Sequence, residues 1–265
     1  MVNGVPFPCS ILEQAAHLAD GVDNVVPIHP SPFKVACASC AVREVCLPLG
    51  FGADDLRRFD PLVARRRTVR RFEALYRSGE PFRALFAVRT GFFKSSLAPK
   101  CGREQVTGFQ MAGEVLGFDG IASERHTTDA YALEDSQVCV IPYFELETLS
   151  RDMPELQRQL HRIMSREIVR DHAVMLLLGS MRAEERLAAF IANLADRLRA
   201  RGFSGSRLVL RMTREEIGSY LGLKLETVSR AFSRLQEDGV LEVRQRHVTV
   251  IDAAALERIA HPLAN

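Results

Sequence analysis

The feature that most limits the folds open to this chain is an unbroken helical pattern from Pro154 to about Leu178. Proline is tolerated in the first turn of a helix, and Gly179, directly after the pattern, is a typical helix end. A helix of this length is long for an element of a single globular core. The sequence therefore predicts a long helix that divides two differently built parts of the chain and has more than one packing partner.

The apolar residues of this helix form two stripes, one of Leu156, Leu160, Ile163, Val174 and Leu177 and the other of Met164, Ile168, Met175 and Leu178. The second stripe steps by four, seven and three residues and leaves a place at position 171, which is the alternation of a coiled coil. We therefore expect the first stripe to cover the helix's own domain. The second is expected to pack on another copy of the chain in a homodimer, with Ile168, Asp171 and Met175 on the seam.

Asp171 gives this seam an unusual property, because its carboxylate would face its own copy in the partner subunit. Two like charges brought together in a partly dry seam repel each other and resist desolvation. The charge should therefore oppose dimerisation unless something else favours the dimer, which would make the helix a two-state switch. The alternative is that Asp171 is only a solvated residue at the edge of the seam.

The part of the chain before the long helix has a different pattern. Short apolar runs alternate with glycine or proline from about Phe51 to Tyr143, for example Leu85–Val88 and Val138–Ile141. Runs of this length and spacing are typical of antiparallel strands, so we expect a β sandwich or roll. Residues 1 to about 35 contain five of the twelve prolines and no sustained periodicity, which indicates a flexible leader.

After the long helix, a helical block over Ala183–Arg201 is followed by two short amphipathic helices with a turn at Gly222 between them. Thr213 and Glu216 have the spacing of a capping box at the start of the first short helix. The inward-facing apolar residues of the two helices are Ile217, Leu221, Val228, Phe232 and Leu235. This pattern predicts a helix-turn-helix, and the alternating stretch Val240–Ile251 predicts a hairpin wing after it.

Three side chains of the second short helix face away from its apolar stripe, and these are Glu226, Ser229 and Arg230. They lie near the helix N-terminus, the part of a recognition helix that reaches base edges. Arginine can bind guanine O6 and N7 together, and glutamate can accept a hydrogen bond from cytosine N4. We therefore expect these residues to read DNA, with Arg244 and Arg246 of the wing on phosphates. The alternative is an ordinary surface ion pair between Glu226 and Arg230.

The stretch Glu226–Arg230 resembles the cyclic AMP receptor superfamily and, within it, the fumarate and nitrate reduction regulators. The similarity extends over about Cys37–Ile251. In that branch the corresponding Glu, Ser and Arg read a TTGAT half-site repeated as a palindrome. The resemblance therefore implies double-stranded DNA as a partner, and RNA polymerase as another. Leu225 stands where the cyclic AMP branch carries an arginine, so a half-site different from that of the cyclic AMP branch is expected.

Cys37, Cys40 and Cys46 form a Cys-x₂-Cys-x₅-Cys cluster. Thiolates are soft ligands that suit iron-sulfur clusters, Zn²⁺ or Cu(I), and in a reducing compartment cysteines are more often thiols or metal ligands than disulfides. Three cysteines are an incomplete ligand set. The candidates for a fourth ligand, among which spacing does not choose, are Cys9, Cys101 and Cys139.

The family resemblance does choose among them. The fumarate and nitrate reduction regulators hold a [4Fe-4S] cluster with three N-terminal cysteines and one distant cysteine before an apolar strand end that carries proline. Cys139-Val-Ile-Pro142 matches that strand end. The resemblance therefore implies an oxygen-labile [4Fe-4S] cluster, whose intact form favours the dimer, bound by Cys37, Cys40, Cys46 and Cys139. Cys9 and Cys101 are expected to be spare thiols, and a structural zinc site in place of the cluster is the alternative.

The same superfamily contains cyclic nucleotide sensors, and Gly113-Glu114 matches the start of their phosphate-binding stretch. An Arg-Ser pair should follow about ten residues later in such a sensor. Here Arg125-His126-Thr127 is shifted and altered. We therefore expect Glu114 to be structural and no cyclic nucleotide to act as effector.

Composition limits the remaining classes of protein. With 47% hydrophobic and 26% charged residues the chain should fold into a proper core. A net charge of +2 argues neither for nor against nucleic acid, so the DNA prediction rests on the motif. The seven histidines are scattered, with no acid-base or nucleophile motif, and an enzyme is not expected. No membrane span or secretory signal is visible in the sequence, so a cytoplasmic location is expected.

These patterns predict an α+β chain with an antiparallel β-roll, a long helix and a winged helix-turn-helix. The expected order is a flexible leader over 1–35, an iron-sulfur-bearing β-roll sensor domain over 36–150, a dimerisation helix over 151–181 and a DNA-binding domain over 182–265.

Overall fold

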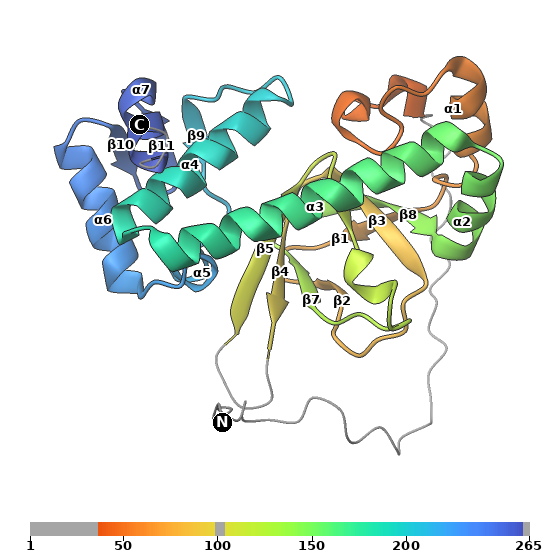
Figure 1. Ribbon diagram of the computed structural model, residues 1–265, viewed down its shortest axis with the longest axis horizontal. Coiled ribbons are helices and arrows are strands. Elements are labelled where there is room, and N and C mark those ends of the chain that lie inside the picture. Colours follow the sequence, from red (N-terminus) through yellow and green to blue (C-terminus); the bar gives the residue numbers. More distant parts are fainter. Residues whose placement is uncertain (1–36, 99–103, 262–265) are drawn as a thin grey trace, which may run out of the picture. The chain divides into compact units, whose positions relative to one another are not determined.

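The computed structural model describes residues 37–98 and 104–261 (Figure 1). The leader expected over 1–35 lies outside these ranges, as do Cys9 and Cys101. The helices and strands up to the long helix are α1 (Ala53–Phe59), β1 (Arg66–Val69), β2 (Ala74–Tyr76), β3 (Ala84–Thr90), β4 (Phe92–Leu97), β5 (Gln105–Met111), β6 (Val115–Leu116), β7 (Asp129–Ala132), β8 (Ser136–Pro142) and α2 (Tyr143–Arg151). The remaining elements are α3 (Pro154–Ser180), α4 (Ala183–Arg199), β9 (Arg207–Val209), α5 (Arg214–Leu221), α6 (Leu225–Glu237), β10 (Leu241–Arg244), β11 (His247–Val250) and α7 (Ala253–Ala260).

Strands β1 to β8 form two four-stranded antiparallel sheets, in the orders β1-β8-β3-β6 and β2-β7-β4-β5. Side chains of the two sheets meet in one apolar core, to which β3, β4 and β8 contribute Val88, Phe93 and Val138, all fully buried. Sheets that bury their inner faces against each other in this way form the β-roll that the sequence predicts.

The first sheet is covered on its outer face as well. Because side chains alternate along a strand, Leu85 and Ala87 of β3 point away from the core that Val88 enters. They pack with the segment before α1, with α1 itself, and with α2 and the start of α3. Cys139 lies on the same outer face of β8, since it follows the inward-facing Val138 and pairs with Ala87 in register.

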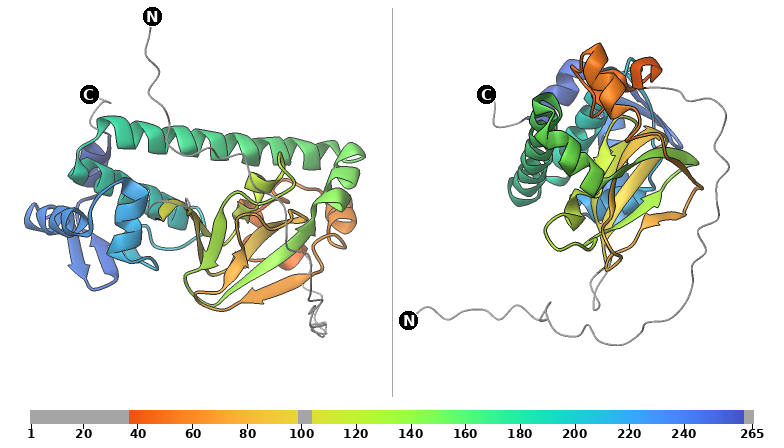
Figure 2. Two further views of the ribbon diagram at one scale, coloured as in Figure 1. Left: turned by 90° about the horizontal axis from the view of Figure 1, so that it is seen from below. Right: turned by 90° about the vertical axis from the view of Figure 1, so that its right-hand side faces the viewer.

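Helix α3 runs unbroken from α2 to α4 (Figures 1 and 2), and Pro154 lies in its first turn as the sequence predicts. Leu156 and Ile163 are buried against the β-roll side. Met164, Ile168 and Met175 of the second stripe are exposed. Leu178, the last residue of the second stripe, is partly buried near Gly222. The two stripes therefore differ in exposure as far as Met175.

The C-terminal part combines helices with a small sheet of order β10-β11-β9. Helices α4, α5 and α6 pack through one core in which Leu187, Ile217, Val228 and Phe232 are buried. The predicted helix-turn-helix and hairpin wing are both present, so the predicted α+β fold is confirmed. In the described ranges, no helix combines the length and the apolar character that a membrane span requires.

Four elements differ from the sequence-based expectation. Helix α1 interrupts the region expected to form strands, because acidic residues in its first turn and basic residues in its last suit the helix dipole while Leu56 and Phe59 share a buried face. Helix α2 likewise fills the interval between the strands and α3. Strand β9 and helix α7 add to the two helices and hairpin expected at the end of the chain, and Asp252 caps α7 by accepting from Ala255 N at 2.9 Å.

Candidate functional site

The segment from Cys37 to Cys46, here called the cysteine loop, is wound into short turns. Cys40 N donates to Cys37 O at 3.1 Å, and Cys46 N donates to Arg43 O at 3.3 Å. The start of the loop is also fixed by the Cys37 amide, which donates to Asp60 Oδ1 at 2.8 Å. These local bonds hold Cys37, Cys40 and Cys46 close to one another.

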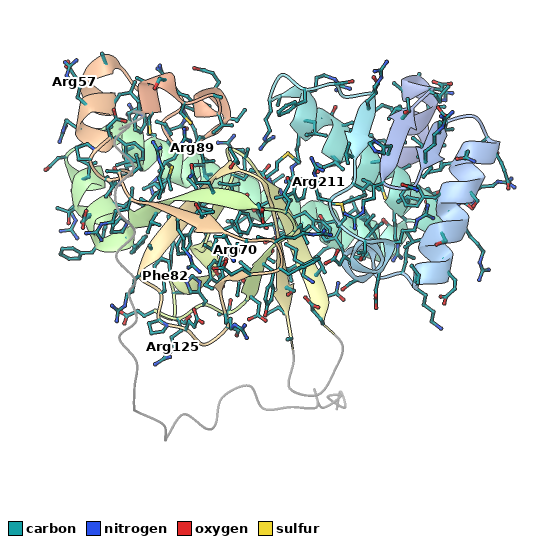
Figure 3. The ribbon with its side chains drawn as sticks, turned by 180° about the vertical axis from the view of Figure 1, so that it is seen from behind. Arg57, Arg70, Phe82, Arg89, Arg125 and Arg211 are labelled. Atoms are coloured by element: carbon teal, nitrogen blue, oxygen red, sulfur yellow. The ribbon has the colours of Figure 1, made fainter. Side chains whose placement is uncertain are left out.

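Strand β8 brings Cys139 to this loop. All four cysteines line a cavity of about 30 Å³, together with Ala87, Arg89 and Ile141 among others. Figure 3 labels Arg89, which comes from strand β3 beside β8. Three cysteines of the loop and one from a distant strand thus share a single small cavity.

Burial raises the pKa of three of these thiols, those of Cys37, Cys46 and Cys139, and so favours their protonated form. It raises the pKa of the Cys46 thiol to about 12, and it raises the pKa of Cys139 although the nearby charges of Arg66 and Arg89 act in the opposite direction. For Cys37, burial and then the Asp60 carboxylate raise the pKa. Thiolates are the metal-binding form, so a metal that binds here must displace protons.

The four thiols line the cavity without closing around one point. Within residues 37–98 and 104–261, no three His, Cys, Asp or Glu side chains are grouped closely enough to hold a single metal ion. The donor set is nonetheless all sulfur, which suits iron-sulfur clusters.

The helix-turn-helix forms as its sequence predicts. Thr213 Oγ1 accepts from Glu216 N at 3.1 Å, and Glu216 Oε2 accepts from Thr213 N at 2.7 Å, which completes the capping box of α5. Gly222 ends α5 with φ 63°, a left-handed conformation that favours glycine. This tight turn sets the angle at which α6 begins.

Helix α6 presents the three expected side chains opposite its buried stripe. Val228 and Phe232 are buried, whereas Glu226 and Arg230 are exposed and Ser229 is partly exposed. In the described part of the chain, no ion pair joins Glu226 to Arg230, so the ordinary surface pair weighed from the sequence is not formed. Both charged groups are therefore available to an external ligand.

The wing supplies further positive charge. Arg246 is exposed at the β10–β11 turn, and Arg244 is exposed while it pairs with Glu242 at 2.6 Å. Strand β11 pairs on its other side with β9, which fixes the wing to the domain.

The second stripe of α3 also lies open. Ile168 and Met175 are 54% and 60% exposed, and Asp171 is exposed between them. The residues predicted for the seam are therefore open to a second copy of the chain.

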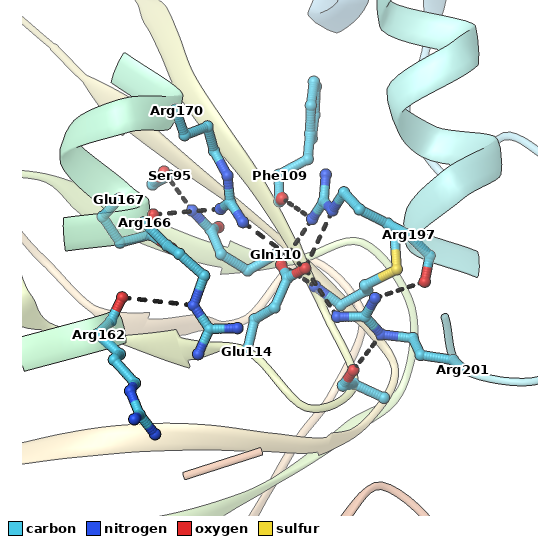
Figure 4. Close-up of polar contacts among 12 residues, drawn as sticks. Ser95, Phe109, Gln110, Glu114, Arg162, Arg166, Glu167, Arg170, Arg197 and Arg201 are labelled. Atoms are coloured by element: carbon cyan, nitrogen blue, oxygen red, sulfur yellow. Dashed lines mark hydrogen bonds and ion pairs between the residues drawn. The ribbon is translucent and has the colours of Figure 1, made fainter. Parts of the chain in front are cut away.

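One cluster was missed from the sequence, where Glu114 was expected only to be structural. Glu114 Oε2 lies 2.6 Å from Arg197 Nη2 and Oε1 lies 2.8 Å from Arg201 Nη2, with Arg170 at 3.8 Å (Figure 4). Arg197 also donates to Phe109 O at 2.6 Å. Arg197 and Arg201 are one helical turn apart, a spacing that is visible in the sequence, but nothing in the sequence indicates that they meet Glu114.

Two domain families match the two halves of this structure. Residues 66–152 match the cyclic nucleotide-binding domain, and residues 185–259 match the Crp-like helix-turn-helix domain.

Known relatives match most of this chain. The transcriptional regulatory protein btr of Bordetella pertussis is 45% identical over 86% of this chain and 95% of its own length. The fumarate and nitrate reduction regulatory protein of Yersinia pestis is 40% identical over 88% of this chain and 93% of its own length. The structure of FixK2 from Bradyrhizobium japonicum, 31% identical, matches 74% of this chain and 96% of its own with a TM-score of 0.67. With a DNA-binding domain of this type and relatives that are regulators rather than enzymes, the chain belongs to the fumarate and nitrate reduction branch of the CRP/FNR family of transcription regulators.

Proposed function

We propose that this regulator responds to oxygen through a [4Fe-4S] cluster held by Cys37, Cys40, Cys46 and Cys139. The observation that carries the proposal is the single cavity shared by these four cysteines, three from one loop and one from β8. When bound, such a cluster would connect the cysteine loop to β8, and this connection would be lost when oxygen destroys the cluster. A cytoplasmic location fits this role, because a reducing compartment keeps the thiols available.

The donor set suits a cluster, because the four cysteines that line the cavity offer only sulfur donors and iron-sulfur clusters are held by cysteine thiolates. Cys37, Cys40, Cys46 and Cys139 would hold the cluster through their sulfur atoms. A structural zinc ion would use the same thiols, and the metal content of the purified protein distinguishes the two.

The dimer forms through the exposed stripe of α3. A second copy would cover Ile168 and Met175 and place the two Asp171 carboxylates across the seam from each other. Their repulsion weakens the dimer. A modest stabilisation of the dimer by the cysteine loop, which acts at the start of α3, then decides the equilibrium between monomer and dimer. Gln159 of α3 already donates to Leu49 O at 2.5 Å, which connects the helix to the segment after the loop.

The dimer reads a palindromic TTGAT-type site. Each α6 lies in the major groove with Glu226, Ser229 and Arg230 on base edges, and Arg244 and Arg246 contact phosphates. The bound dimer then acts on transcription through RNA polymerase. We expect no cyclic nucleotide as effector, since the Glu114 carboxylate, in the stretch that matches the cyclic nucleotide sensors, already serves as partner to Arg197 and Arg201.

An absorption spectrum of the protein purified without oxygen, repeated after exposure to air, tests this function. We expect a brown protein whose visible absorption bleaches in air, together with loss of binding to the palindrome. A colourless protein that contains zinc and binds the palindrome equally well in air would overturn the proposal.

A further inference from the structure

We propose that Glu114 couples the cysteine loop to the DNA-binding domain, residues 185–259. Its neighbour Gly113 contacts Val45 of the loop, and its carboxylate pairs with Arg197 and Arg201. This coupling goes beyond the proposed function and does not depend on it, because protein contacts alone carry it.

The carboxylate of Glu114 is the meeting point of three elements. Arg197 belongs to α4, Arg201 follows that helix, and Arg170 belongs to α3. Oε1 accepts from Arg197 Nε at 3.0 Å as well as from Arg201 Nη2 at 2.8 Å. Both oxygens are therefore engaged, and Arg197 meets them in a two-pronged arrangement.

The cluster is shielded from water. The side chain of Glu114 is 11% exposed, and those of Arg197 and Arg201 are 15% and 6% exposed. Breaking a buried ion pair leaves an uncompensated charge, so separating Glu114 from its arginines is costly. This property suits a contact that passes on a change of position from one element to another.

Gly113 and Glu114 lie in the turn between β5 and β6. The side of this turn that carries Gly113 contacts the cysteine loop directly. A Cβ added to Gly113 would lie 2.5 Å from Val45 Cγ2 and 3.2 Å from Val45 O, so the loop backbone rests on this glycine. Gly113 has φ 91° and donates to Val88 O at 2.7 Å, while Val88 N donates to Glu114 O at 2.8 Å. The turn is thus fixed to β3, with the residue before Cys46 on one side and two arginines of the DNA-binding domain on the other.

A second ion pair between the same two parts of the chain offers a matched control. Glu134 lies 3.0 Å from Arg211 Nε, and both side chains are about as exposed as ordinary surface residues, at 33% and 42%. Figure 3 labels Arg211. In the described residues, no hydrogen bond or ion pair joins Glu134 to the cysteine loop. Lys94 also pairs with Glu216 of α5 at 3.1 Å, and Phe109 packs in one apolar core with α4, so contacts between the two parts remain when either pair is removed.

Hydrogen-deuterium exchange of the full-length chain, purified in air without a cluster, tests the coupling. The amides that report are the hydrogen-bonded ones of two segments, residues 43–51 in and after the cysteine loop and residues 197–203 at the end of α4. Their donors include Arg43, Val45, Cys46, Leu49 and Phe51 in the first segment and Ala200, Arg201, Gly202 and Phe203 in the second. Glu114→Gln should accelerate exchange about fivefold or more in both segments. Glu134→Gln should change exchange in residues 43–51 by less than about twofold.

Val45→Ala tests the same coupling from the opposite end and perturbs folding less. It removes the closest contact with Gly113, that of Val45 Cγ2, without touching Arg197 or Arg201. It should accelerate exchange in residues 197–203, because coupling between two sites is reciprocal. Unchanged exchange at 197–203 in Val45→Ala, or unchanged exchange at 43–51 in Glu114→Gln, would overturn the proposal. Since no cluster is present in these samples, failure of the oxygen-sensing proposal would leave this result intact.

Discussion

Cys139 in strand β8 and Cys46 in the cysteine loop line the same cavity, although nearly the whole β-roll separates them in the sequence. The alternation of β8 explains how they meet. Val138 enters the core between the sheets, so Cys139 must point to the outer face, where the loop packs. A shift of β8 by one residue would bury Cys139 between the sheets and separate it from the loop.

Replacing Asp171 with alanine should produce a dimer that binds its palindrome in air without a cluster, because the like charges on the seam are removed. Sedimentation of the air-exposed variant measures this directly. Glu155→Ala, which removes an acidic group of α3 that pairs with Arg158, is the control and should stay monomeric in air. A monomeric Asp171→Ala protein, at concentrations where the anaerobic wild type is dimeric, would show that Asp171 does not oppose dimerisation.

Replacing Arg230 with alanine should weaken binding to the specific palindrome by about 1 to 3 kcal/mol per half-site and relax discrimination at one base pair. Arg246→Ala, at the exposed wing, should instead weaken specific and random duplexes alike and lower the salt dependence. Titration of both duplexes at two salt concentrations separates the two effects. Equal losses on both duplexes for Arg230→Ala would reduce its role to a phosphate contact.

The Glu114 cluster predicts a pH dependence of stability. Burial alone would raise the pKa of Glu114, but the charges of Arg197, Arg170 and Arg201 outweigh it and the pKa is lowered. A carboxyl whose pKa is lower in the folded state stabilises the fold above its unfolded value of about 4.3, and this contribution is lost as the pH falls through the folded pKa.

Glu114→Gln should therefore be less stable than the wild type at pH 7, by about 3 to 5 kcal/mol for a broken buried pair. Its stability should also fall less steeply below about pH 4.5, because it has no carboxyl to protonate at this site. Urea unfolding from pH 3 to 7 measures both effects. Glu134→Gln, which breaks an exposed pair, should cost about 1 kcal/mol or less. Parallel curves for Glu114→Gln and the wild type would contradict the lowered pKa.

Local signals explain which parts of this fold could be predicted from the sequence. The capping box of Thr213 and Glu216, the turn at Gly222 and the two stripes of α3 depend on residues within a few turns of one another, and all three are present. Helix α1 was missed because its seven residues carry only one buried pair, Leu56 and Phe59, which is too short a pattern to distinguish from a strand region.

Long-range contacts account for what the sequence left open. Spacing alone did not distinguish Cys139 from Cys9 and Cys101, and the family resemblance supplied the choice. The partners of Glu114 come from α3 and from α4 and the residues just after it, and no periodicity links them to the β5–β6 turn. A contact among three elements that are distant in sequence depends on tertiary packing, which a one-dimensional pattern does not encode.

The iron and sulfide content of serine variants, purified without oxygen, tests the central claim most directly. Cys139→Ser should lose the cluster, as should Cys46→Ser, because a serine hydroxyl is a poor replacement for thiolate at neutral pH. Cys101→Ser and Cys9→Ser are the matched controls and should keep about four irons and four sulfides per chain, like the wild type. Full iron content in Cys139→Ser, or its loss in Cys101→Ser, would contradict the assignment of the four ligands.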